Sequence, residues 1–184
     1  MKGIKIVGFS GSLRHGSYNE AALRAAKEMM PSNVVMDILN LSDIPFYNED
    51  LEATGIPESV ITFKNKLKEA DAILISTPEY NFSIPAVLKN ALDWASRGSD
   101  YPLNLKPTAI MSASPSMLGG ARVQYHLRQV CVCLNMLVIN KPEVFINHAN
   151  QKFDETGKLI DEDTKRVIQS LIDALITKVV DCSK

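Results

Sequence analysis

The sequence lacks an excess of charge of either sign: its 184 residues contain 20 lysines and arginines and 21 aspartates and glutamates. The resulting net charge of −1 argues against the strongly basic surface typical of nucleic-acid-binding proteins and against an acidic disordered tail. No apolar run approaches the roughly 20 residues that span a bilayer, so we expect no membrane span. No separate apolar stretch with a cleavage site opens the chain, so we expect no secretory signal.

Cysteine is also scarce. The chain has three, Cys131, Cys133 and Cys182, and an odd number without a secretory signal indicates free thiols in a reducing cytoplasm. Cys131 and Cys133 stand two apart on an expected helix, so their thiols point about 200° apart and do not favour a disulfide or a shared metal. The histidines show no metal-ligand spacing, and we therefore expect no bound metal.

Short apolar runs alternate with amphipathic segments along the whole chain. The apolar runs are rich in β-branched residues, which is typical of buried strands. We expect strands at 4–9, 34–39, 72–77 and 108–112, and a fifth at 137–140 that continues at 144–146 after an interruption at Pro142. We expect helices at 19–30, 58–69, 85–97, 120–134 and 162–180, and a long loop at 40–57.

This alternation predicts a parallel sheet with helices on both faces. Five strands fit a three-layer flavodoxin-like α/β fold better than the longer six-stranded dinucleotide-binding fold, and we expect residues 1–184 to form this single domain. Ligands of such sheets bind beyond the carboxyl ends of the strands. A site is therefore expected in the loops that follow Phe9, Thr77 and Ser112.

The first of these loops, residues 10–19, is rich in small and hydroxyl-bearing residues. Its backbone N–H groups can converge on an anion, and the next helix adds partial positive charge at its N-terminus. Ser12, Ser17 and Asn19 can donate hydrogen bonds, and Arg14 adds a guanidinium. The loop predicts a phosphate site; the alternative is an ordinary turn with a helix cap.

The kind of phosphate follows from the residues that the loop lacks. Gly11 and Gly16 have the spacing of a P-loop, but Ser17 stands where a P-loop has lysine, so a triphosphate would lose its usual partner. The glycines do not form G-x-G-x-x-G, and Asp37 alone does not establish a ribose contact. A single terminal phosphate fits best.

The second and third loops suit a flat ring. Two prolines stiffen the second loop, whose Tyr80 and Asn81 can present an aromatic edge and an amide to a planar heterocycle. The third loop, residues 112–120, offers Ser114, Ser116 and two consecutive glycines. Together with a phosphate loop on the same edge, they favour a mononucleotide such as FMN.

These motifs resemble those of the NADPH-dependent FMN reductase family. Gly11-Ser12-Leu13-Arg14, followed by Ser17 and Asn19, is similar to its phosphate motif, and Pro78-Glu79-Tyr80-Asn81 is similar to its ring-binding loop. The segments 119–128 and 140–143 resemble its chromate- and quinone-reductase branch. The resemblance covers nearly the whole chain, in order.

The resemblance implies noncovalent FMN, NAD(P)H as the donor, and dimers or tetramers. It implies no catalytic side chain, because the flavin carries the chemistry. Ser116 stands where relatives often have glycine, so the contacts of 115–117 are not carried over. The cofactor-binding residues would be Ser12, Arg14, Ser17, Tyr18 and Asn19 for the phosphate end, and Pro78, Glu79, Tyr80, Asn81 and Ser114 for the ring.

The sequence thus predicts an oxidoreductase that passes hydride from NAD(P)H through FMN to quinones by a ping-pong mechanism. Chromate, azo compounds and free flavin are further expected acceptors. A flavodoxin-type electron carrier and a non-catalytic flavin-binding protein are the alternatives. A carrier usually needs a strongly acidic docking face, which the net charge of −1 does not favour.

Two expected helices have a second apolar stripe. Val87 and Trp94 lie on one, and Tyr125 and Arg128 on the other. Aromatic and arginine side chains on an exposed helix face suit a subunit interface. We therefore expect self-association about a twofold axis, with Arg128 and its neighbours pairing with an acid such as Glu143.

Overall fold

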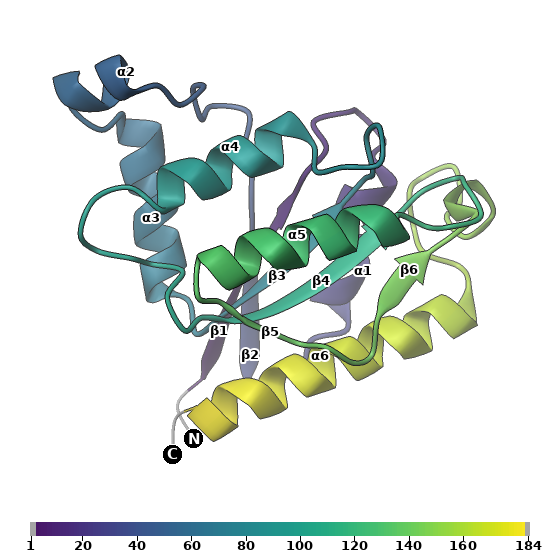
Figure 1. The fold of residues 1–184 in the computed structure, drawn as a ribbon. Coiled ribbons are helices and arrows are strands. Elements are labelled where there is room, and N and C mark those ends of the chain that lie inside the picture. The colour runs from purple at the N-terminus through teal and green to yellow at the C-terminus, as the bar shows by residue number, and fades with distance from the viewer. Residues whose placement is uncertain (1–2, 183–184) are drawn as a thin grey trace.

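The computed structural model describes residues 3–182, and Figure 1 shows a parallel sheet between two layers of helices. The sheet has the order β2-β1-β3-β4-β5, and β6 also pairs with β4. The strands are β1 (Ile4–Ser10), β2 (Val34–Leu39), β3 (Ala72–Thr77), β4 (Pro107–Ala113), β5 (Leu137–Val138) and β6 (Val144–Ile146). The helices are α1 (Tyr18–Glu28), α2 (Glu49–Thr54), α3 (Glu58–Glu69), α4 (Ala86–Ala95), α5 (Ala121–Cys133), α6 (Glu162–Cys182) and the 3₁₀ turn η1 (Ala149–Gln151).

Each face of the sheet has its own hydrophobic core. Successive residues of a strand point to opposite faces, so Ile4 and Ile6 of β1 pack on the side of α1 and α6, whereas Val7 and Phe9 pack on the side of α3, α4 and α5. The central strands β3 and β4 are buried on both faces, as expected of a parallel sheet, whereas the edge strand β2 is partly exposed. The three-layer flavodoxin-like fold predicted from the sequence is confirmed.

Two segments differ from the prediction. The strand expected at 137–146 consists of two short strands on either side of the cis Lys141–Pro142 peptide, which pair with opposite ends of β4. Pro142 has no N–H to donate to a strand ladder, which explains the interruption. The expected loop at 40–57 contains α2, whose N-terminus is capped by Asn48, with the side chain accepting a hydrogen bond from Leu51 N.

The segment between β2 and α2 is fastened to α4. The Pro45 carbonyl accepts hydrogen bonds from Asn90 Nδ2 (2.8 Å) and Trp94 Nε1 (2.7 Å), and Tyr47 N donates to Asn90 Oδ1 at 2.8 Å. Trp94 is fully buried and meets the Tyr47 ring edge-on at a centroid distance of 5.0 Å. The prediction that Trp94 lies on an exposed interface stripe is therefore wrong, because this segment covers it.

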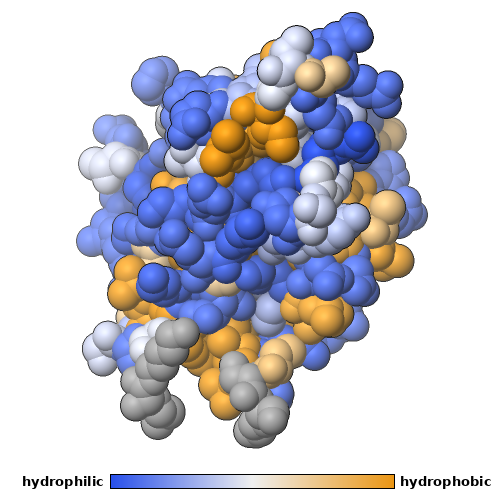
Figure 2. Space-filling view, turned by 90° about the vertical axis from the view of Figure 1, so that its left-hand side faces the viewer, coloured by the Kyte–Doolittle hydropathy of each residue, from blue (hydrophilic) through white to orange (hydrophobic). Residues whose placement is uncertain are grey.

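Figure 2 views the molecule from the side of α2 and α3 and shows a mostly hydrophilic surface with several separate apolar patches. Within residues 3–182, no helix combines the length and apolar character needed to cross a membrane.

Asn19 ties the start of α1 to two strands at the carboxyl edge of the sheet. Its Oδ1 accepts hydrogen bonds from Ala113 N (2.8 Å) and Ser76 Oγ (3.1 Å), and its Nδ2 donates to the Ala113 carbonyl at 2.9 Å. The side chain is almost fully buried, so these bonds are shielded from water. This Asn19 clasp fixes the first loop relative to β3 and β4.

We expect Asn19→Ala to lower the free energy of unfolding by about 2–3 kcal/mol, because it leaves the buried Ala113 N–H and carbonyl without their partner. Urea unfolding followed by circular dichroism measures this loss. The exposed Asn65→Ala on α3 is the control, and we expect it to change stability by less than about 0.5 kcal/mol. Equal stability of the two variants would contradict this role of the Asn19 clasp.

The cysteines differ in exposure as the helical spacing predicts. Cys131 is buried, and burial raises the pKa of its thiol to about 12, whereas Cys133 and Cys182 are exposed. Because the thiolate is the reactive form, we expect a thiol reagent at pH 8 to modify two cysteines of the folded protein and the third only after denaturation. Mass spectrometry of the labelled peptides checks this, and fast labelling of Cys131 in the folded protein would contradict it.

Candidate functional site

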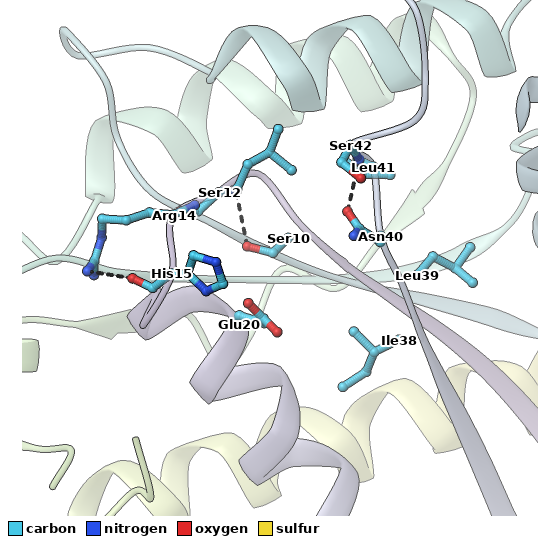
Figure 3. A pocket seen from close by; sticks show the side chains of 11 residues that line it. Ser10, Ser12, Arg14, His15, Glu20, Ile38, Leu39, Asn40, Leu41 and Ser42 are labelled. Atoms are coloured by element: carbon cyan, nitrogen blue, oxygen red, sulfur yellow. Dashed lines mark hydrogen bonds between the residues drawn. The ribbon is translucent and has the colours of Figure 1, made fainter. Parts of the chain in front are cut away.

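The loops after β1, β3 and β4 meet at the carboxyl edge of the sheet, where the strand order reverses beside β1. A cavity of about 400 Å³ flanks the first loop (Figure 3). Asn40 and Ser42, which follow β2, lie across it from Ser12 of the first loop, whereas the Arg14 side chain points away from them toward the His15 carbonyl. The cavity is lined by the first loop, by Glu20 of α1 and by residues 38–42 at and after the end of β2, whereas the second and third loops lie on the other side of the first loop, over β3 and β4.

The first loop turns tightly against β3. Gly11 N donates a hydrogen bond to the Ser76 carbonyl at 3.0 Å, and a Cβ on Gly11 would lie 2.6 Å from Thr77 Oγ1. Only glycine fits there without displacing the Thr77 side chain. Ser12 is buried and its N–H donates to Ser10 Oγ at 3.1 Å. These contacts set the starting direction of the loop.

The rest of the loop presents donors to an anion. Ser17 caps α1, with its Oγ accepting a hydrogen bond from Glu20 N, and Gly16 has a φ of +65°. In the described chain, the N–H groups of Leu13, His15 and Gly16 have no hydrogen-bond partner. Unpaired N–H groups at a helix N-terminus form an anion site. The geometry therefore fits the predicted phosphate.

The side chains of Arg14 and Tyr18 contact each other. The Arg14 guanidinium lies 5.5 Å from the centroid of the Tyr18 ring, and the Tyr18 ring packs against Phe153 at a centroid distance of 5.7 Å. Arg14 Nη1 also donates to the His15 carbonyl. Tyr18 therefore supports the arginine, while Asn19, also predicted for the phosphate, points its side chain into the sheet.

The second loop is a two-residue hairpin. Tyr80 and Ser83 exchange backbone hydrogen bonds of 3.1 and 2.9 Å, and the residues between them, Asn81 and Phe82, have φ of 49° and 65°. Positive φ at both central residues is the geometry of a type I′ turn, which asparagine tolerates better than phenylalanine does. The turn displays Tyr80 and Phe82 to solvent, each more than half exposed.

The third loop is held from below by Gln124. Gln124 Nε2 donates to Ser112 Oγ and to the Val144 carbonyl, both at 2.8 Å, and Ser112 Oγ donates to the Gly119 carbonyl at 2.6 Å. A Cβ on Gly119 would lie 2.8 Å from Asn147 N, which explains the glycine. The corner of the loop that leads into α5 is therefore closely packed.

The serines of the third loop bond to each other. Ser114 Oγ donates to Ser116 Oγ at 3.0 Å and accepts from Ser116 N at 3.1 Å. Ser116 is not among the described residues with a left-handed φ, so its Cβ requires no unusual backbone. The departure from glycine at this position leaves the loop intact.

Glu79 connects the second loop to α5. Its Oε2 accepts hydrogen bonds from Arg122 N (3.0 Å) and Val123 N (3.1 Å), and its Oε1 accepts from Arg122 Nη1 at 3.1 Å. Arg122 in turn stacks on Phe82, with 3.9 Å between the guanidinium carbon and the ring centroid. The side chain of Glu79, predicted for the flavin ring, therefore points toward a helix N-terminus.

The charged groups that we expected to pair between subunits around Glu143 have partners within the same chain. Arg128 donates to the Ile139 carbonyl and to Asn140 Oδ1. Hydrogen bonding from Lys141, with further contributions from Arg128 and Tyr125, holds the pKa of Glu143 below its usual value. The bonding of these groups within one chain explains their local arrangement without a neighbouring subunit.

Sequence reasoning missed Phe82 and Gln124 as parts of the site. Phe82 carried no signal, because a phenylalanine after Asn81 does not indicate a left-handed turn. Gln124 looked like a polar position on a helix, although it is fully buried. One signal was available in the sequence: Gly119-Gly120 provides no side chain to cap the helix that follows, so the capping group must come from another loop.

The residues present fit FMN. The first loop offers unpaired N–H groups and a guanidinium for a phosphate, the hairpin offers exposed aromatic rings, and the third loop offers hydroxyl groups. Among residues 3–182, no group of three or more metal-ligating side chains is gathered that could hold a metal ion. The arrangement therefore favours binding a phosphate-bearing planar group over acid–base catalysis by side chains.

Comparison with known proteins agrees with this geometry. The chain is 48% identical over 172 residues to an NAD(P)H-dependent FMN reductase of Pseudomonas aeruginosa, covering 94% of this chain and 93% of the relative. It is 42% identical over 164 residues to a quinone reductase of Escherichia coli, covering 88% and 87% of the two chains. The structure of FerB, a flavoenzyme NAD(P)H:(acceptor) oxidoreductase from Paracoccus denitrificans, superposes with a TM-score of 0.88 at 31% identity, covering 97% of this chain and 98% of FerB.

The family comparison confirms the resemblance drawn from the motifs. The sequence model described as NADPH-dependent FMN reductase matches residues 4–151, which contain all three loops. The predicted oxidoreductase class, FMN and NAD(P)H are confirmed with it. The chain belongs to the NADPH-dependent FMN reductase family.

Proposed function

We propose that this protein is a quinone reductase that uses NAD(P)H and FMN in a ping-pong cycle. The observation that carries the proposal is the combination of an anion-binding first loop with an exposed aromatic hairpin on the same edge of the sheet. The relatives in Escherichia coli and in potato, named quinone reductase and NAD(P)H:quinone oxidoreductase, support quinones as the acceptor class. Chromate, azo compounds and free flavin stay predictions.

Bound FMN supplies hydride transfer between the nicotinamide and the acceptor. The chain's own residues bind and orient the cofactor. Ser12, Arg14, Ser17 and the unpaired N–H groups of the first loop hold the phosphate. Tyr18 supports Arg14, and Asn19 fixes the loop. Pro78, Glu79, Tyr80, Asn81 and Ser114 belong to the loops that border the ring.

The exposed hairpin accounts for the proposed kinetic order. Tyr80 and Phe82 are 52% and 61% exposed, so the hairpin that we assign to the flavin ring is open to solvent. One open face admits the nicotinamide and the quinone in turn, since both are flat rings that stack in the same place. A protein that serves only as an electron carrier has no need for this alternation.

We also propose that the protein acts in the cytoplasm as a dimer or tetramer. Three free cysteines, two of them exposed, suit a reducing compartment. Tyr125 and Val132 on α5 are 54% and 78% exposed, and apolar side chains on one helix face support self-association.

Arg14→Ala tests the phosphate assignment. The variant loses a charge-assisted contact worth about 1.5–3 kcal/mol, so we expect FMN to bind roughly ten- to a hundredfold more weakly. Riboflavin, which lacks the phosphate, should bind the wild type weakly, and the Arg14→Ala substitution should change its affinity little. Fluorescence titration of the apoprotein measures both affinities. Arg24→Ala, which removes an exposed arginine of α1, is the control, and equal binding of FMN and riboflavin to the wild type would refute the assignment.

Steady-state kinetics test the proposed cycle. We expect parallel double-reciprocal lines when NAD(P)H is varied at several quinone concentrations, because the two substrates occupy the site in turn. NAD(P)H alone should bleach the flavin absorbance under anaerobic conditions, and added quinone should restore it. Intersecting lines without bleaching would rule out ping-pong, and no NAD(P)H oxidation at all would favour an electron carrier.

A further inference from the structure

The N-terminus of α5 has no cap of its own. The residue before the helix is Gly120, which has no side chain to accept a hydrogen bond, and the first turn contains no acidic residue. The first N–H groups of a helix have no intrahelical acceptor and give its N-terminus partial positive charge. In a closely packed corner, these groups need an acceptor from elsewhere in the fold.

Glu79 supplies that acceptor from a different loop. Its carboxylate accepts from the N–H groups of Arg122 and Val123 and from the Arg122 guanidinium, and the side chain is only 13% exposed. The remaining N–H groups of the first turn are paired locally, Ala121 N with the Leu118 carbonyl. We call the contacts of Glu79 with Arg122 and Val123 the Glu79 bridge.

The Glu79 bridge joins two loops that are otherwise independent in sequence. On one side, Glu79 directly precedes the hairpin that starts at Tyr80. On the other side, α5 is anchored to β4 and β6 through Gln124, so its N-terminus is a fixed point. Ser83 Oγ and His126 Nδ1, 3.2 Å apart, add a second contact between the same hairpin and helix.

We infer that Glu79 is a positioning residue that sets the distance between the second and third loops and offsets the positive charge of Arg122 and of the α5 N-terminus beside the ring site. The inference rests on the proposed binding of FMN between these loops. Two consequences follow. Loss of the bridge weakens the hold on the ring and leaves the phosphate contacts of the first loop unchanged. Loss of its charge leaves Arg122 and the α5 N-terminus without their negative partner, so the midpoint potential of bound FMN becomes more positive, because the reduced flavin carries more negative charge than the oxidised one.

The test compares Glu79→Gln, Glu79→Asp and Glu52→Gln with the wild type. Glu52 is a matched control: it also binds an arginine through its carboxylate, Arg97, and is 22% exposed, but it fastens the segment between β2 and α3. Glu79→Asp keeps the charge and shortens the side chain, which separates the charge from the geometry. Thermal unfolding of the apoproteins verifies that each variant folds.

Flavin titration gives the first readout. We expect Glu79→Gln to weaken FMN and riboflavin by the same factor, about tenfold, because both share the ring. Glu79→Asp should weaken binding to a smaller extent and leave the midpoint potential near that of the wild type, whereas Glu79→Gln should raise the potential. Glu52→Gln should change neither. Affinities and a potential in Glu79→Gln equal to those of Glu52→Gln would overturn the inference.

Hydrogen exchange of the apoproteins gives a readout that needs no flavin. We expect Glu79→Gln to accelerate exchange in residues 78–84 and 118–124 together, and Glu52→Gln to accelerate it only around 45–54. Acceleration in both segments with no flavin binding by the wild type would retain the bridge and refute the proposed function. Unchanged exchange at 118–124 in Glu79→Gln would overturn the bridge itself.

Discussion

The hydrogen bonds of Asn19 are the constraint on which the site depends. The first loop leaves β1 and must enter α1 at a fixed height above the sheet, and Asn19 sets that height by bonding both polar groups of Ala113 on β4 and the hydroxyl of Ser76 on β3. A buried amide with these partners has one satisfactory position, because any shift leaves backbone groups of the strand unpaired. The phosphate end of the site is therefore built relative to the strands that carry the other two loops.

The two helices that begin at the site differ in whether the N–H groups at their N-termini are already bonded within the protein. α1 is capped by Ser17 within its own loop, which leaves the preceding N–H groups free for a ligand. The N–H groups of Arg122 and Val123 at the start of α5 are occupied by the Glu79 carboxylate. An anion approaching the edge of the sheet therefore meets an available positive helix end at α1 and a neutralised one at α5. This difference supports the proposed placement of the phosphate at the first loop and of the uncharged ring near α5.

Local patterns in the sequence predicted the fold because they depend on local physics. Buried strands and amphipathic helices follow from periodicity, and the anion loop follows from small residues before a helix. The roles of Asn19 and Glu79 were not predictable in this way, because the partners of Asn19 lie 57 and 94 residues away in the chain and those of Glu79 lie 43 and 44 residues away. A motif places such residues at the site but does not say whether a side chain faces the ligand or the protein. The interruption at Pro142 was visible in the sequence, whereas the covering of Trp94 by Pro45 and Tyr47 required the three-dimensional path of the segment.

In a flavin enzyme of this kind, the protein acts mainly by positioning the cofactor. No side chain of the described site is arranged as an acid–base pair, so the scaffold influences the reaction mainly through where the ring is held and which face is open. On the side of the third loop, Gln124 bonds to β4 and β6, and Gly119 is packed closely against the chain after β6. The open side is the hairpin, where Phe82 adopts a left-handed backbone and lies under the Arg122 guanidinium. Since Arg122 is itself held by Glu79, the surface that an acceptor meets is coupled to the same carboxylate that joins the two ring loops. In the proposed cycle, acceptor preference and cofactor binding are therefore linked through Glu79, and we expect a change at this residue to alter both.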